Sequence, residues 1–173
     1  MKTKIIKNNL GISILEVVVA ILIITMGMVG VLSLVIQNIE AQYINKNVLI
    51  ASGLAQEGLE LVRNVRDTNW LTSGHDWKLG AGAGTNSDII QDGNYAIDYD
   101  GDIIDVDDIG NARLYIDGNG FYTHAVGATA TNFYRLITVV DNSDYVDVRC
   151  TIRWTEGAQN RDYTAATYLY NWR

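Results

Sequence analysis

The chain has 173 residues, a length that fits one globular domain with its own hydrophobic core and not two. Its formal net charge of −7 argues against nucleic-acid binding, which needs a basic surface, and against docking on anionic lipid headgroups. Its one cysteine, Cys150, excludes an intrachain disulfide, and the sequence has no Cys-x-x-Cys pair for a metal or redox site.

Residues 12–36 form an apolar segment in which 19 of the 25 residues are aliphatic, Ala or Met. About 20 such residues span the hydrocarbon core of a bilayer, whereas the apolar core of a secretory signal has only about 7–15. We therefore expect a transmembrane helix. Lys2, Lys4 and Lys7 precede it and only Lys46 follows closely, so the N-terminus is expected in the cytoplasm and the rest of the chain outside.

Glu16 is the anomaly of this segment. A carboxylate costs about 3 kcal/mol at the centre of a span, and less near the end where Glu16 lies. No Lys, Arg or His occurs between residues 12 and 36, so a positively charged partner has to come from outside this helix.

The stretch from Gly11 to Ala20, Gly-Ile-Ser-Ile-Leu-Glu-Val-Val-Val-Ala, resembles the N-terminal motif of type IV prepilins. That motif is a short basic leader ending in Gly, an apolar residue, and Glu as the fifth residue of the mature chain. The resemblance implies that a membrane aspartyl peptidase cuts between Gly11 and Ile12 and methylates the new amine of Ile12. It also implies that Glu16 meets the N-terminal amine of a neighbouring subunit. Ile12 stands where the family usually has Phe or Met.

The resemblance implies a structural subunit of a type IV pilus or related filament, and no enzyme. Its partners would be other pilin subunits, the prepilin peptidase and the membrane assembly machinery. It would first be single-pass in the bacterial plasma membrane, with the C-terminal domain outside, and then part of an extracellular filament. The stretch Thr25–Leu32 is also similar to minor pilins of the pilus-modification type and to a type II secretion pseudopilin.

Several alternatives stay open. They are a membrane-anchored pseudopilin of a type II secretion system, and a single-pass surface binding module that is not processed. Major and minor subunits, and pilus, secretion and DNA-uptake systems, share this N-terminus. Gly27 and Gly30 suit either a local helix break on assembly or close helix packing.

Residues 37–66 continue as the amphipathic half of the same helix, since apolar residues recur there at helical spacing. The turn-like cluster Asp67–Trp70 ends the pattern at Arg66 and opens a loop region, residues 67–92. Within that region the Gly-rich run Gly80–Gly84 lacks the spacing of a phosphate-binding loop and is typical of a flexible linker.

Residues 93–173 are predicted to form a β-rich domain. Val146, Val148 and Cys150 alternate with polar residues, which places the thiol on the apolar face of a strand. We expect an α+β fold, in which a long N-terminal helix, half transmembrane and half amphipathic, packs on a C-terminal antiparallel sheet. The predicted strands are Tyr95–Tyr99, a hairpin of Arg113–Asp117 and Phe121–His124, and a meander of Phe133–Val140, Tyr145–Thr155 and Tyr163–Trp172.

Asp98, Asp100 and Asp102 begin the one dense carboxylate cluster and are the candidates for calcium, the sole cofactor considered. An EF-hand loop starting at Asp98 would need Gly and Glu where the chain has Ile103 and Ile109, so an acidic surface loop is the favoured interpretation. Neither histidine, at positions 75 and 124, has a second zinc ligand at suitable spacing, and no catalytic residues are predicted.

Overall fold

The computed structural model describes residues 11, 13–72, 74, 76–78, 92–127 and 129–172. The predicted leader up to residue 10, Ile12, His75 and the Gly80–Gly84 run lie outside the described residues. Contacts divide the chain into one unit up to Asn45 and a second from Lys46 onward, and each is described by itself.

Helix α1 extends over Ile14–Leu71. Every residue from Ile14 to Lys46 is exposed, whereas the part from Ala51 onward buries one face. The expected apolar stripe is confirmed from this point on. The buried residues of α1 are Ala51, Leu54, Ala55, Gly58, Leu59, Val62, Val65 and Asn69.

The predicted helix end at Arg66 is wrong, because α1 continues to Leu71. The residues taken for a turn are held by packing: Asn69 is 1% exposed, and its side-chain amide donates to the carbonyl of Trp77 at 3.2 Å. At the end of the helix, the Thr72 N–H donates to the carbonyls of both Thr68 and Asn69. The predicted loop region 67–92 therefore begins after Leu71.

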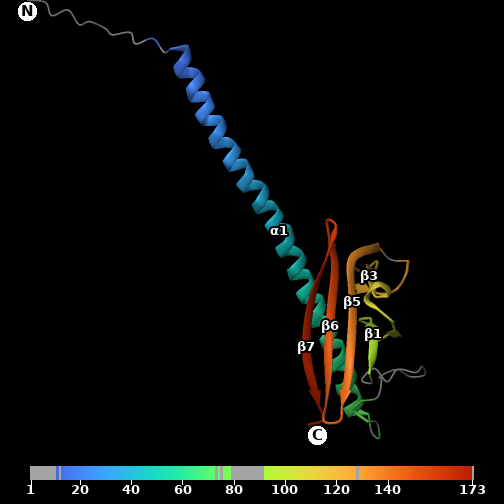
Figure 1. The fold of residues 1–173 in the computed structure, drawn as a ribbon. Coiled ribbons are helices and arrows are strands. Elements are labelled where there is room, and N and C mark those ends of the chain that lie inside the picture. The colour runs from blue at the N-terminus through green and yellow to red at the C-terminus, as the bar shows by residue number, and fades with distance from the viewer. Residues whose placement is uncertain are drawn as a thin grey trace, which may run out of the picture. The chain divides into compact units, whose positions relative to one another are not determined.

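The second unit contains seven strands in one antiparallel sheet (Figure 1). The strands follow the path β2-β1-β5-β3-β4, and β6 pairs β5 on its other side and β7 in turn. Strand β5, the longest, therefore lies in the middle of the sheet. Strands β1 and β3 pair with one of its edges, and β6 pairs with the other. The bounds are β1 Gly93–Ile97, β2 Ile103–Asp105, β3 Arg113–Ile116, β4 Tyr122–Thr123, β5 Thr129–Asn142, β6 Tyr145–Glu156 and β7 Gln159–Tyr170, with a 3-10 turn η1 at Ile109–Asn111.

The expected meander is confirmed as β5, β6 and β7, and β3 pairs β4 as the expected hairpin. Several strand bounds differ from the prediction: β1 lies two residues earlier than predicted, β4 is shorter, and β5 and β7 each begin four residues earlier. Strand β7 starts at Gln159 because Gly157, with φ of 62°, and Ala158 close a two-residue turn. Strand β2 was not predicted: Ile103–Asp105, inside the supposed acidic loop, pairs with β1.

One face of the sheet packs on the second half of α1, which confirms the α+β arrangement. Figure 1 shows that half of the helix behind β6 and β7. The helix contributes its buried stripe, and the sheet contributes alternate residues of its strands, as period-two side-chain placement requires. The fully buried members from the sheet include Ile97, Leu114, Ile137, Val139, Val146, Val148, Cys150 and Ile152.

Candidate functional site

The N-terminal end of α1 carries a helix cap next to Glu16, the one charged residue of its first turns. Ser13 precedes the helix: its hydroxyl accepts from the Leu15 N–H at 3.3 Å, and its carbonyl accepts from the Val17 N–H at 3.2 Å. Ser followed three residues later by Glu is the pattern of a capping box. Glu16 also lies in the first turn, where the helix dipole favours a negative charge. The sequence pattern and the helix dipole thus both favour a glutamate at this position.

Glu16 is also isolated in a long apolar surface. The next charged residue along the chain is Glu40, and the first basic residue after it is Lys46. The side chains on both sides of Glu16 are exposed, with 84% of Ile14, 74% of Leu15 and 71% of Met26 accessible. The helix is long and apolar enough to cross a membrane. In such a span the Glu16 carboxylate lies near one end without a partner on its own helix.

Two further features of this segment bear on the sequence predictions. Gly11 is exposed, whereas Ile12, the predicted residue after the cut and the predicted methylation site, lies outside the described residues. Helix α1 is continuous through Gly27 and Gly30. A Cβ at either glycine would meet no other atom within 4 Å, so packing inside the chain does not require glycine there.

The clearest polar cluster of the β-rich unit joins Asp98, Thr123 and His124. One carboxylate oxygen of Asp98 accepts from the His124 N–H at 2.7 Å and lies 2.6 Å from the ring Nδ1. The other oxygen accepts from the Thr123 hydroxyl at 2.7 Å. Burial alone would raise the pKa of Asp98, but these hydrogen bonds outweigh it and hold the pKa below its usual value. The cluster ties the end of β1 to β4.

The calcium candidates do not converge on one point. Asp98 turns inward to His124, whereas Asp100 is exposed and accepts from the Asp102 N–H at 3.2 Å, as in a turn. Within the described residues, no group of three His, Cys, Asp or Glu side chains is arranged to hold a metal ion. The acidic cluster is therefore best described as the surface of the β1–β2 turn and of strand β2.

A buried ion pair joins α1 to the sheet. The Arg135 side chain is 0% exposed, its Nη2 donates to the Ile97 carbonyl at 2.7 Å, and its Nη1 lies 3.0 Å from Oε1 of Glu57. The Nη1 contact has the distance of an ion pair but not the alignment of a hydrogen bond. Sequence patterning missed this pair, because a single Arg in a strand gives no sign of pointing inward.

A groove of about 500 Å³ lies between α1 and the β1–β2 turn. Its apolar floor includes Leu61, Val65 and Ile97, and its rim carries the carboxyl groups of Glu60 and Asp100. Among the described residues that line it there is no histidine, cysteine or lysine. The carboxyl groups therefore have no partner there of the kind that forms a nucleophile with its general base. We assign no reaction to this groove.

In comparisons with protein-family models, curated proteins and solved structures, nothing matches this chain. Its function is therefore argued from the residues and the geometry described above.

Proposed function

We propose that this chain is a structural subunit of a type IV pilus or a related filament. In this proposal a peptidase removes the leader after Gly11, the first half of α1 holds the subunit in the membrane, and the subunit then assembles through that helix. One observation carries the proposal: Glu16 is the only charge of an exposed apolar helix surface, and it lies five residues after the predicted cut.

The partner that fits Glu16 is the amine that cleavage would create at Ile12 of a neighbouring subunit. Opposite charges attract strongly in a low-dielectric setting, and an unpaired charge there is costly. A subunit whose Glu16 meets this amine is thus favoured at one axial position over others. The apolar surface around Glu16 would leave lipid for contact with the same surface of other subunits, at little cost in hydrophobic free energy.

Glu16→Gln separates the charge of this side chain from its shape. Glutamine fits a capping box as glutamate does but has no charge. We expect Glu16→Gln chains to be cut normally in cells and to be depleted from sheared filaments by roughly tenfold or more, the effect of losing a partly desolvated ion pair. Ser13→Ala, which removes the cap and keeps the charge, is the matched control and should assemble nearly normally.

Two measurements decide the proposal. Mass spectrometry of the mature N-terminus tests the cut and the methylation of Ile12, and an intact leader would instead support an unprocessed surface binding module. Normal assembly of both Glu16→Gln and Glu16→Ala would contradict the pairing role. If the filaments are confined to a periplasm-spanning secretion complex, the chain is instead a pseudopilin of a type II secretion system.

A further inference from the structure

The outer face of β6 and β7, opposite the helix, carries an exposed tyrosine cluster. Tyr168 is 56% and Tyr170 51% exposed, and both rings contact Tyr145, with centroids 5.3 and 5.8 Å apart. Val140 of β5, 44% exposed, lies on the same face, since it is opposite Asp147 in the β5–β6 register. Tyrosines with a neighbouring arginine are typical of the residues that dominate binding energy at protein interfaces.

Arg149 extends this surface and exposes its guanidinium there, although its pair with Asp147 is neutral overall. Its guanidinium donates to Asp147 at 2.7 Å, yet 57% of the Arg149 side chain is exposed and only 11% of that of Asp147. The arginine is thus the member of the pair that faces solvent, and most of its five N–H donors remain available. We call Val140, Tyr145, Arg149, Tyr168 and Tyr170 the tyrosine–arginine face.

The opposite end of the sheet carries uncompensated negative charge. Among the described residues, the exposed carboxylates here form no ion pair, whereas Arg149 and Arg153 on the outer face each have one. Exposed apolar side chains lie between them: Ile104 is 47% exposed, and Tyr99 contacts Phe121. We call this surface the acidic edge; it consists of Tyr99, Asp100, Asp102, Ile104, Asp105, Asp107 and Phe121.

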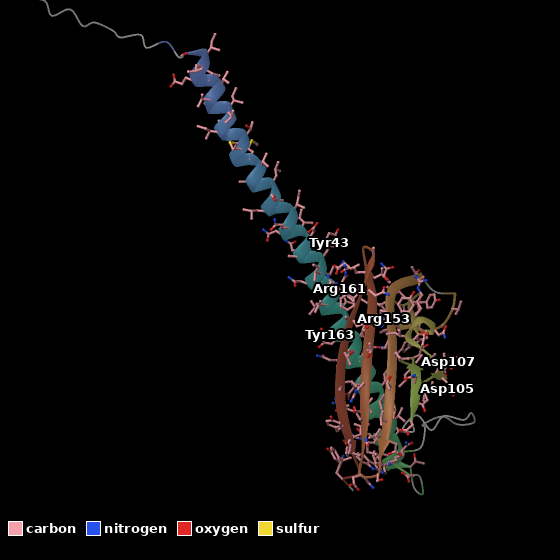
Figure 2. The ribbon with its side chains drawn as sticks, in the orientation of Figure 1. Tyr43, Asp105, Asp107, Arg153, Arg161 and Tyr163 are labelled. Atoms are coloured by element: carbon pink, nitrogen blue, oxygen red, sulfur yellow. The ribbon has the colours of Figure 1, made fainter. Side chains whose placement is uncertain are left out.

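The two surfaces lie on different strands of the sheet. The acidic edge lies at β2 and the β1–β2 turn, and the tyrosine–arginine face lies on β6, β7 and the end of β5, so β5 and β1 stand between Arg149 and β2. Figure 2 shows Asp105 and Asp107 to one side of the sheet and Arg153 on β6. Among the described residues, Arg149 forms its ion pair with Asp147 and none with the acidic edge of its own chain.

We propose that the acidic edge of one copy of this chain binds the tyrosine–arginine face of the next copy. The acidic edge offers carboxylates without an ion pair to the exposed guanidinium of Arg149, and each surface has apolar side chains to bury. Because they are different surfaces, the contact is heterologous and leaves a free surface of each kind on every pair, so that copies add head to tail. This is the symmetry that an open filament needs, and the inference rests on the proposed function.

Engineered cysteines test this contact in the full chain. Cys150 is fully buried and does not interfere. Ala166 is exposed opposite Arg149, and Ile104 lies within the acidic edge, so each accepts a cysteine without loss of charge. With a short thiol crosslinker, isolated filaments of Ala166→Cys/Ile104→Cys should give a ladder of multimers, and either single variant should give monomers. Dimers of Ala166→Cys alone would indicate a two-fold contact and overturn the inference.

Charge reversal in this double-cysteine background tests the chemistry. Asp105→Lys/Asp107→Lys should lower the crosslinked fraction about tenfold, because like charges then face Arg149. Adding Arg149→Asp to the same chain should restore the ladder. Asp67→Lys, one reversal of the same kind placed on α1, should leave the ladder unchanged, and an equal loss there would contradict the inference.

The filaments themselves separate this inference from the proposed function. Processed chains in intact filaments without a ladder would overturn the head-to-tail contact alone. An uncut N-terminus and no filaments would overturn both.

Discussion

Gly58 of α1 lies directly against Cys150 of β6. A Cβ built on Gly58 would stand 2.6 Å from the Cys150 Sγ and 3.3 Å from the Arg135 Cδ, so the backbone of α1 meets the sheet at this point without room for a side chain. Both Gly58 and Cys150 are buried. This contact sets how closely the helix approaches the sheet.

Gly58→Ala is therefore expected to destabilise the β-rich unit by about 1–3 kcal/mol, the usual cost of overpacking a core. Gly53→Ala is the matched control, since a Cβ there meets nothing within 4 Å. Alanine in place of an exposed helical glycine should stabilise by up to about 1 kcal/mol. Urea unfolding of the full chain in detergent, followed by tryptophan fluorescence, measures both. Equal effects of the two substitutions would contradict close packing at Gly58.

Local patterning predicted the elements whose signal lies within a few residues. Strand β6 alternates apolar and polar residues without interruption, so its bounds were predicted to within one residue, and Cys150 was correctly placed on the buried face. The apolar stripe of α1 from Ala51 onward was found in the same way, because its period differs from that of a strand.

Features that depend on distant contacts could not be predicted. Asn69 has the character of a turn residue, but its bond to Trp77 keeps it in the helix. Strand β2 has only three residues, too few to give a strand pattern inside an acidic stretch, and its pairing with β1 defines it. Asp98 and His124 are 26 residues apart, and only the fold brings them together.

The Cys150 thiol is expected to resist modification in the folded protein. Burial raises its pKa to about 12, so the reactive thiolate is scarce at neutral pH, and the side chain is not accessible. A maleimide reagent at pH 7.5 should label the chain only after denaturation. Rapid labelling of native protein, or a disulfide-linked dimer on a non-reducing gel, would contradict this prediction.

Asp98→Asn should destabilise the protein by about 2 kcal/mol at pH 7, because it removes the charge that accepts from His124 and Thr123. The pKa of Asp98 is lower in the folded state than in the unfolded chain. The stabilisation is therefore complete above the unfolded pKa of about 3.9 and is lost as the pH falls through the folded pKa.

The difference in stability between wild type and Asp98→Asn should accordingly shrink below about pH 4. Urea unfolding at a series of pH values measures it. Asp100→Asn, an exposed neighbour, is the control and should change stability by no more than about 0.5 kcal/mol. A difference that grows as the pH falls would show that the carboxylate form of Asp98 does not stabilise the fold.

The Glu57–Arg135 pair should behave as one unit. Glu57→Gln leaves the buried guanidinium without its counter-charge and should cost about 1–3 kcal/mol, less than for a fully buried pair because 39% of the Glu57 side chain is exposed. In an Arg135→Met background no buried cation remains, so the same substitution should cost almost nothing. A double-mutant cycle by urea unfolding measures this coupling free energy. Equal costs of Glu57→Gln in the two backgrounds would show that the pair contributes nothing, and that Arg135 is held by the Ile97 carbonyl alone.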